Sequence, residues 1–321
     1  MKTAVIIPCY KTKKFILPIV HNVLSMKEVW RLYIVDDCCP EKTGEYVKEN
    51  IQDTKLMILF NNENLGVGGA TLTGWQQACV DGAEILIKID GDGQMDICYI
   101  PKIVNLIQKH KYDYVKGQRF WNLESFVDMP RKRAFGNMAL SFITKISSGY
   151  YNIFDPTNGY IAINAKVFEI LPSKKISKSF FFESDMLFHL NIIRAVIKEV
   201  PMIAIYGKEK SNLKISKILF DFPYLHIVNF VKRIVFNYYL RGMSVGSISL
   251  PLGLTFFVFG ITFGCFFWIR SLCIGEIATS GTVMVSALTI ICGIQFILLF
   301  FVEDFGNVPK TSLISEDFEI K

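Results

Sequence analysis

The chain has 321 residues, a formal net charge of +6 and a mean hydropathy of +0.34, and 51% of its residues are hydrophobic. This hydrophobic share exceeds the about 45–50% typical of soluble domains, so the composition disfavours a wholly soluble globular protein. We therefore expect part of the chain to lie in lipid, and the length leaves room for two ordinary domains.

The N-terminal part alternates short aliphatic runs with helix-like stretches. The expected strands are TAVIIP, RLYIVDD, KLMILF and EILIKIDGD, followed by DYVKGQRF and TNGYIAIN. Helices are expected at residues 15–26, 41–52 and 69–81. This alternation predicts an α/β fold with βαβ units and a parallel sheet. Ligands bind at the carboxyl ends of such strands, where Pro8–Tyr10, Asp36–Asp37 and Asp90–Asp92 fall.

The stretch LIKIDGDGQMD, residues 86–96, places three carboxylates within seven positions after an apolar strand. A divalent cation would cancel the charge of Asp90 and Asp92, because Mg²⁺ and Mn²⁺ prefer oxygen ligands and often join carboxylates to substrate phosphates. Gln94 and Asp96 add further oxygens within reach. The alternative is a solvated turn that binds no metal.

Two other segments at the expected strand ends suit a nucleotide. Asp36 and Asp37 can accept hydrogen bonds from a ribose or a base, although one of them could instead cap the helix that starts near Glu41. The Gly-rich segment at residues 62–74 precedes a helix, so its amides could face a phosphate. It could equally be a tight turn that only packs the helix against the sheet.

The excess of apolar residues lies near the C-terminus. The segments Ile248–Ile269 and Thr282–Val302 carry no charge, and each is long enough to span a bilayer as a helix. A short loop joins them, so we expect a hairpin with both ends on one side. Residues 208–241 hold seven Lys or Arg against two acids. The positive-inside rule then places the N-terminal domain in the cytoplasm.

Aromatic residues interleave with the basic residues of 208–241. This pattern predicts interfacial helices that lie against anionic lipid headgroups. The alternative is the basic, solvated face of a soluble helix.

Seven motifs in order resemble those of the inverting family-2 glycosyltransferases: VIIPCY, IVDD, NLGVGGATLTG, IDGDGQMD, VKGQRF, DPTNGY and FFESD. The resemblance covers residues 2–212 and is to the membrane-anchored branch similar to polyprenyl-phosphate sugar transferases. It implies a nucleotide-sugar-binding, Rossmann-like domain of the glycosyltransferase A type. The expected division is a catalytic domain (1–207), basic amphipathic helices (208–244), two transmembrane helices (245–303) and a cytoplasmic tail (304–321).

The resemblance assigns binding roles by motif. The nucleotide would contact Pro8, Tyr10, Asp36 and Asp37. The metal, Mg²⁺ or Mn²⁺, would be held by Asp90, Asp92 and Gln94. Donor or acceptor phosphates would be held by Arg119, Arg131 and Arg133, although the last two could simply be surface charge. The first motif departs from the family's Pro-x-Tyr-Asn-Glu, because Lys11 and Thr12 occupy the final two positions.

The same resemblance implies catalytic carboxylates. Asp185 in FFESD matches the family's base, Glu183 lies close by, and Asp155 in DPTNGY matches an acidic site that faces the acceptor. The structural alternatives are a cap at a helix start for Glu183 or Asp185, and an Asx-type turn for Asp155 before Pro156.

These observations predict a metal-dependent inverting glycosyltransferase in the cell (inner) membrane, multi-pass, with its catalytic domain in the cytoplasm. It would move a sugar from a UDP- or GDP-sugar to a polyprenyl phosphate. Alternatives are transfer to a hydroxyl of a lipid-linked glycan in surface polysaccharide biosynthesis, or a silent nucleotide-sugar- or lipid-binding protein. A homo-oligomer is compatible with the sequence, and we expect no nucleic acid partner. A dinucleotide oxidoreductase is disfavoured because PCYKTKK replaces the GxGxxG expected after the first strand.

Overall fold

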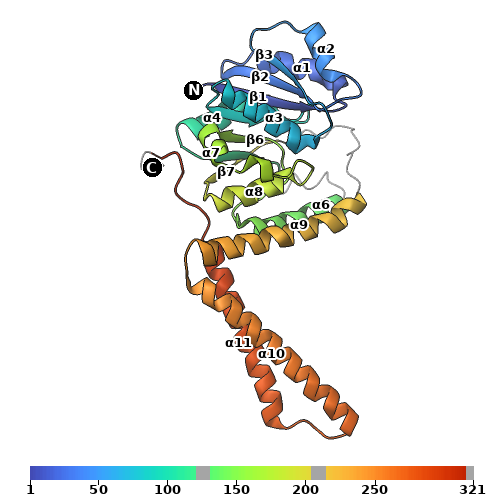
Figure 1. Cartoon of the computed structure of the whole chain (residues 1–321), viewed down its shortest axis with the longest axis vertical. Coiled ribbons are helices and arrows are strands. Elements are labelled where there is room, and N and C mark those ends of the chain that lie inside the picture. The colour runs from blue at the N-terminus through green and yellow to red at the C-terminus, as the bar shows by residue number, and fades with distance from the viewer. Residues whose placement is uncertain (121–130, 204–214, 316–321) are drawn as a thin grey trace. The chain divides into compact units, whose positions relative to one another are not determined.

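The computed structural model describes residues 1–120, 131–203 and 215–315, and these form two compact units (Figure 1). The first unit comprises Met1–Phe230 with Pro309–Lys321, and the second comprises Val231–Val308. The first unit contains a seven-stranded sheet in the order β3-β2-β1-β4-β6-β5-β7. The strands are β1 Thr3–Cys9, β2 Val29–Asp36, β3 Leu56–Phe60, β4 Ile85–Lys88, β5 Tyr114–Gln118, β6 Ile161–Asn164 and β7 Ile197–Pro201.

The predicted α/β fold is confirmed, but the expectation of a parallel sheet is wrong for one strand. β6 runs antiparallel to both β4 and β5, whereas the other neighbouring pairs are parallel. Its first residue, Ile161, pairs with Lys88 at the carboxyl end of β4. The DPTNGY segment, which precedes β6, therefore lies at the carboxyl edge of β4. From there β6 runs antiparallel to β4.

The first unit also contains helices, the last of which continues into the second unit. They are α1 Lys13–Leu24, α2 Thr43–Asn50, α3 Gly66–Val80, α4 Ile100–Gln108, α6 Arg131–Ser148, α7 Ala165–Ile170, α8 Phe182–Ile192 and α9 Ile215–Val235. The helices expected at 15–26, 41–52 and 69–81 correspond to α1, α2 and α3. Every residue of β1 is buried, and Trp75 of α3 is fully buried against the sheet, so the core lies between these elements.

Parallel pairing of β1 with β2 and β4 decides where the candidate site lies. Cys9 pairs with Asp36, and Ile6 pairs with Lys88. The carboxyl ends of the three strands therefore meet at one edge, as the sequence predicts.

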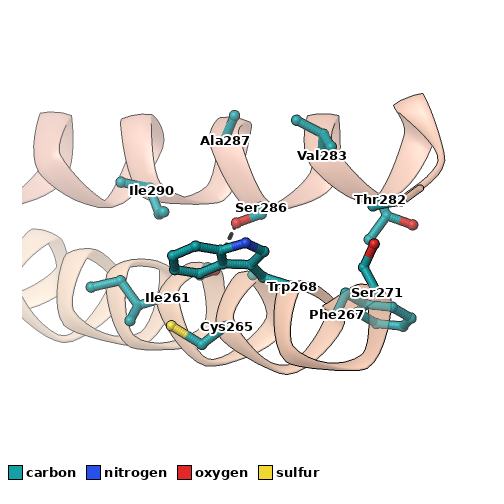
Figure 2. Close-up of a pocket in the computed structure, with 13 residues that line it drawn as sticks. Ile261, Cys265, Phe267, Trp268, Ser271, Thr282, Val283, Ser286, Ala287 and Ile290 are labelled. Carbon is teal, nitrogen blue, oxygen red and sulfur yellow. Dashed lines mark hydrogen bonds between the residues drawn. The ribbon is translucent and has the colours of Figure 1, made fainter. Parts of the chain in front are cut away.

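The second unit contains two long apolar helices, α10 Val245–Ile274 and α11 Ser280–Gly306. Both are long and apolar enough to cross a membrane, and both extend beyond the predicted spans. Small residues bring them close: Ser286 donates a hydrogen bond to the carbonyl of Gly260 at 2.9 Å. Figure 2 shows a hollow between these helices that is lined by Trp268 and its neighbours.

A buried ion pair joins the end of α9 to α11 within this unit. Arg233 Nη1 lies 2.6 Å from Asp304 Oδ1, and Tyr238 donates to the same oxygen at 2.8 Å. All three side chains are almost fully buried. Charged and polar groups buried in this way must be paired, so the cluster holds the last residues of α9, which belong to this unit, against α11.

The segment after α11 returns to the first unit. Ser312 Oγ and the Leu313 amide donate to Asp113 Oδ1 at 2.7 and 2.9 Å, and the Val196 amide donates to Asp113 Oδ2 at 2.7 Å. Asp113 is completely buried beside β5. The C-terminal segment therefore supplies hydrogen bonds that a buried carboxylate of the first unit needs.

Ser312→Ala is expected to lower the free energy of unfolding by about 1–3 kcal/mol, because it removes one donor from a buried carboxylate. Denaturant titration of the full chain in detergent measures this value. Ser25→Ala is the matched control, since the exposed Ser25 hydroxyl donates to a backbone carbonyl at 2.7 Å. Equal losses in the two variants would show that the Asp113 contact adds nothing.

Candidate active site

Asp36, the last residue of β2, fixes the loop that follows it. Its Oδ1 accepts from the Cys39 amide at 2.7 Å, and its Oδ2 accepts from the Gly44 amide in the first turn of α2 at 2.6 Å. The carboxylate is buried. Asp36 therefore binds an amide at the start of α2, which is the alternative that the sequence allowed for one of the two acids. A nucleotide contact by Asp36 stays a prediction.

Asp37 organises the Gly-rich segment. Its Oδ1 accepts from the Leu65 amide and from Asn61 Nδ2, and its Oδ2 accepts from the Gly66 amide at 2.8 Å. These amides at the start of α3 are therefore bonded to the chain's own carboxylate. A Cβ at Gly74 would lie 2.5 Å from a β1 side chain. Both observations favour a tight turn in residues 62–74 that packs α3 against the sheet, rather than a phosphate-binding loop.

The two residues predicted to line the base lie at the same edge. Pro8 is buried within β1, and Tyr10 just beyond the strand is 40% exposed. Lys11 follows with a left-handed backbone, φ 59°. Exposure of the Tyr10 ring at the carboxyl edge is compatible with stacking on a base, which stays a prediction.

Asp90 and Asp92 lie half-buried in the turn after β4. The Gln94 amide donates to Asp92 Oδ1 at 3.0 Å and tightens this turn, and Lys88 Nζ lies 2.6 Å from Asp90 Oδ1. Across the described residues, no three His, Cys, Asp or Glu side chains meet to hold a metal by themselves. Two partly exposed carboxylates fit an ion such as Mg²⁺ or Mn²⁺ that takes its other ligands from phosphate and water.

Lys88 joins three of the sequence motifs. Its buried Nζ contacts Asp90 at 2.6 Å and Glu183 at the start of α8 at 3.4 Å. A Cβ at Gly159 of DPTNGY would lie 2.5 Å from this nitrogen, so only glycine leaves room for the pair. Burial lowers the pKa of Lys88, but the two carboxylates outweigh burial and hold it above the ordinary value. The ammonium therefore stays charged and sets Glu183 beside the Asp90 turn.

Asp185 lies two residues further along α8 and is buried. Its Oδ2 accepts from the Ser177 amide at 2.7 Å, and its Oδ1 accepts from Asn229 Nδ2 of α9 at 2.8 Å. His189 Nε2 lies 3.8 Å from Oδ2. Both carboxylate oxygens thus tie α8 to neighbouring segments, and neither bond caps α8 itself. The role as base stays a prediction.

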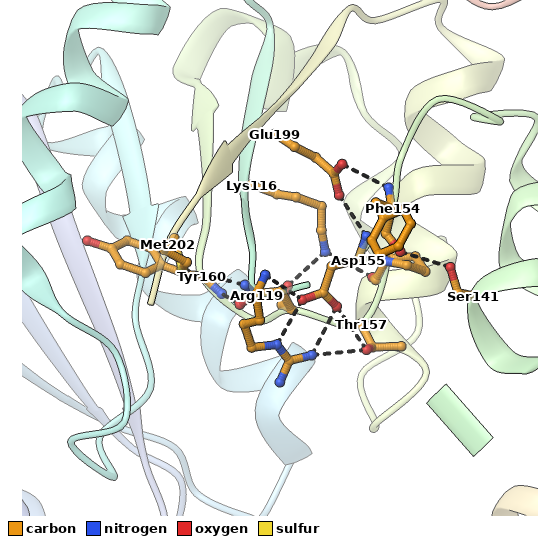
Figure 3. Close-up of polar contacts among 11 residues, drawn as sticks. Lys116, Arg119, Ser141, Phe154, Asp155, Thr157, Tyr160, Glu199 and Met202 are labelled. Atoms are coloured by element: carbon orange, nitrogen blue, oxygen red, sulfur yellow. Dashed lines mark hydrogen bonds and ion pairs between the residues drawn. The ribbon is translucent and has the colours of Figure 1, made fainter. Parts of the chain in front are cut away.

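Asp155 forms a bidentate pair with Arg119 at the end of β5 (Figure 3). The Nε–Oδ2 distance is 2.8 Å and the Nη2–Oδ1 distance is 3.0 Å. Burial raises the pKa of Asp155, but the Arg119 guanidinium outweighs it and holds the pKa below its usual range. Arg131 and Arg133 open α6, and their side chains lie outside the described residues.

Two further charged residues support the DPTNGY segment from neighbouring strands (Figure 3). Glu199 of β7 accepts from the amides of Phe154 and Asp155, both at 2.8 Å. The buried Lys116 of β5 donates to the carbonyls of Pro156 and Asn158 at 2.9 and 2.8 Å. These hydrogen bonds hold the loop at the carboxyl edge of the sheet.

Residues 4–171 match the model of a family described as Glycosyl transferase family 2. The chain belongs to glycosyl transferase family 2. The UDP-N-acetylglucosamine–dolichyl-phosphate N-acetylglucosaminyltransferase of Methanococcus voltae is 32% identical over 63% of this chain and 84% of the relative. The undecaprenyl-phosphate mannosyltransferase of Micrococcus luteus is 26% identical over 67% of this chain and 88% of the relative. The resemblance to polyprenyl-phosphate sugar transferases is thereby confirmed.

Solved structures establish the fold of this family 2 glycosyltransferase. Glucosyl-3-phosphoglycerate synthase of Mycobacterium tuberculosis, in complex with Mn²⁺, UDP and glucosyl-3-phosphoglycerate, matches with a TM-score of 0.53. Its sequence identity is 14%, and the match covers 74% of this chain and 81% of that chain. The predicted glycosyltransferase A type domain is confirmed.

Sequence reasoning missed Lys88, Lys116 and Glu199 in this family 2 glycosyltransferase. The two lysines did leave a signal, because each interrupts a strand that is otherwise buried, in ILIK and YVKGQ. A lysine in such a position must find carboxylates or carbonyls. Glu199 left no comparable signal, since acidic residues are common on an edge strand.

The charge state of Lys116 yields a pH prediction. Burial lowers its pKa to about 8, against the raising effects of Asp155, Glu183 and Glu199. Between about pH 8 and the unfolded value near 10.5, the unfolded chain binds more protons at this site, so stability rises with pH. In Lys116→Met this gain, of the order of 3 kcal/mol, should be absent from denaturation curves. If the free energy of unfolding changed equally with pH in the two proteins, Lys116 would not be neutral at high pH.

Proposed function

We propose that this enzyme transfers a sugar, with inversion, from a UDP- or GDP-sugar to a polyprenyl phosphate at the cytoplasmic face of the membrane. The observation that carries the proposal is the cluster in which Lys88 joins Asp90 of the metal motif to Glu183 of FFESD. The cluster lies at the carboxyl edge of the sheet, in a chain with two helices long enough to cross a membrane. The names of the relatives support the lipid phosphate as acceptor.

The proposed mechanism follows from the charge that develops on the donor. Asp90 and Asp92, with Gln94, would hold Mg²⁺ or Mn²⁺ on the diphosphate, and the ion would stabilise the charge of the departing nucleotide. A polyprenyl phosphate oxygen is already anionic, so it can attack the anomeric carbon without a strong base. Pro8, Tyr10, Asp36 and Asp37 would bind the nucleoside. Arg119, Arg131 and Arg133 would hold phosphates.

A second candidate is transfer to a sugar hydroxyl on a lipid-linked glycan. It is favoured by the buried carboxylates Asp155 and Asp185 and the half-buried Glu183, because a lipid phosphate acceptor would need none of them as a base. A hydroxyl acceptor must lose a proton, and Glu183, Asp185 or Asp155 would remove it.

Glu183→Gln and Asp185→Asn distinguish the two candidates. If the acceptor is a hydroxyl, removal of the base should lower kcat by roughly 100- to 10000-fold. If the acceptor is a lipid phosphate, a loss of roughly tenfold or less is expected. Single-turnover transfer in detergent measures the rate, and a thermal melt verifies that each variant is folded.

The first experiment is a donor screen with purified protein in detergent. Undecaprenyl phosphate and Mg²⁺ or Mn²⁺ are supplied with UDP- and GDP-sugars, and release of nucleotide diphosphate is followed. Release that requires both lipid and metal supports the main proposal. Nucleotide binding without release from any donor, with or without a glycan acceptor, would instead identify a silent binding protein.

A further inference from the structure

The ammonium of Lys88 is shared unequally between two carboxylates. Its Nζ lies 2.6 Å from Asp90 Oδ1 and 3.4 Å from Glu183 Oε1, so the first contact is short and the second is at the outer limit of a hydrogen bond. The Lys88 side chain is 1% exposed, whereas those of Asp90 and Glu183 are 32% and 13% exposed. A buried ammonium cannot turn to water, so it must keep at least one of these carboxylates.

Few other groups hold Glu183. Among the described residues, Lys88 is the one hydrogen-bond donor that reaches its carboxylate. The Tyr114 hydroxyl of β5 is completely buried, and within the described part of the chain it has no hydrogen-bond partner. Burial and the Glu183 charge raise the pKa of Tyr114, so this hydroxyl keeps its proton. A buried donor left unbonded is costly, which leaves the cluster room for a second arrangement around Glu183.

A divalent ion on Asp90 would compete with Lys88 for the same carboxylate. The ammonium contacts Asp90 Oδ1, and Asp90 is one of the residues proposed to hold Mg²⁺ or Mn²⁺. Two positive charges that share one carboxylate repel each other strongly where water is scarce. The ion would therefore weaken the contact between Lys88 and Asp90, and Glu183 is the second carboxylate that the ammonium already reaches.

Gly159 of DPTNGY closes one side of this cluster. A Cβ at this position would lie 2.5 Å from Lys88 Nζ and 2.9 Å from Asp90 Oδ2. The loop that carries Gly159 is itself held by the hydrogen bonds of Lys116 and Glu199. Lys88 is thereby left to move between its two carboxylates rather than away from both.

We infer that Lys88 is a positioning residue that couples metal binding to Glu183. Without the ion, the ammonium holds Asp90. With the ion on Asp90 and Asp92, the ammonium turns to Glu183 and draws that carboxylate toward the Asp90 turn. The inference rests on the metal role in the proposed function and makes Glu183 respond to an ion that it does not bind. Such coupling is reciprocal, so a change at Glu183 must also change the affinity for the ion.

Titration of the full chain with Mn²⁺ in detergent tests the coupling, and electron paramagnetic resonance measures the free ion. Glu183→Gln should raise the dissociation constant for Mn²⁺ by about fivefold or more, because the displaced ammonium loses its second carboxylate. Glu45→Gln is the matched control, since it breaks an exposed pair with Lys42 at 3.0 Å. It should leave the constant within about twofold. An unchanged constant in Glu183→Gln would overturn the inference, even if no Lys88 variant folds.

Lys88→Met separates coupling through the ammonium from direct attraction between Glu183 and the ion. It should lower the dissociation constant for Mn²⁺ by about fivefold or more, because the competing charge is gone. Damage to the fold would instead weaken Mn²⁺ binding. The effect of Glu183→Gln should be smaller in the Lys88→Met background than in the wild type. Equal effects in the two backgrounds would indicate direct attraction and would overturn the inference.

The same titration distinguishes this inference from the proposed function. If Asp92 holds the ion, Asp92→Asn should weaken Mn²⁺ binding by roughly tenfold or more. Weaker binding in Asp92→Asn without any change in Glu183→Gln would overturn the coupling and leave the metal site standing. Unchanged Mn²⁺ binding in Asp92→Asn would remove the metal site from the proposed function, and the coupling with it.

Discussion

Asp92→Asn is expected to lower the rate of sugar transfer by roughly 100- to 1000-fold while leaving the melting temperature unchanged. The change removes the negative charge of one of the two carboxylates proposed to hold the metal on the diphosphate. The asparagine carbonyl can still accept the hydrogen bond that the Gln94 amide donates to Asp92 Oδ1. Folding should therefore survive, whereas stabilisation of the leaving group should not.

The control for this experiment lies away from the metal motif. Asp53 Oδ1 accepts from the Lys55 amide at 2.8 Å, which is a local turn contact like that of Asp92. Asp53→Asn should retain transfer within a few fold, together with the same half-maximal concentration of Mg²⁺ or Mn²⁺. Full activity in Asp92→Asn, or equal losses in the two variants, would remove Asp92 from the metal site.

Asp155→Asn is expected to lower the free energy of unfolding by about 3 kcal/mol. The substitution breaks the bidentate pair with Arg119 in which the Asp155 side chain is completely buried. The loss of unfolding free energy should lie at the lower end of the range for breaking a buried ion pair, because the Arg119 side chain is 28% exposed. Denaturant titration at pH 7 measures it.

The pH dependence of the same variant tests the origin of this loss. Because the pKa of Asp155 is held below its usual range, its contribution is complete above the unfolded carboxyl pKa, about 3.9, and is lost as the pH falls through the folded pKa. The difference between wild type and variant should therefore shrink below about pH 4. Glu45→Gln, which breaks the exposed pair with Lys42, should cost less than about 1 kcal/mol at any pH. A loss in Asp155→Asn that does not change with pH would point to packing instead.

Much of the fold could be predicted because, in the first half of the chain, the spacing of apolar residues and the amino-acid composition indicate the same helices and strands. The aliphatic runs of β1, β2 and β4 are buried on both faces, so they appear in the sequence as continuous apolar stretches. The direction of β6 could not be predicted, since four residues, IAIN, carry no signal of orientation. Helix α6 was not among the expected helices, although Phe135, Met138 and Phe142 recur at helical spacing. Spacing alone also does not say which face of a helix is buried.

The candidate site was likewise predicted only in part. Strand ends and carboxylate spacing indicated where Asp90, Asp92 and the Asp36–Asp37 pair would lie. The contact between Lys88 and Glu183 joins residues 95 positions apart, and no local pattern reports such a contact. Local rules also cannot say that Asp37 bonds the amides at the start of α3, because that depends on how β2 and α3 pack.

The bond between Ser312 and Asp113 bears on how the protein is made. The two residues are 199 positions apart, and both apolar helices lie between them in sequence. A ribosome therefore releases Ser312 only after α10 and α11 have been synthesised. Until then the Asp113 carboxylate lacks two of its donors, so the first unit completes its hydrogen bonds last. A chain that stalls before Ser312 would therefore carry a first unit that is less stable than in the finished protein.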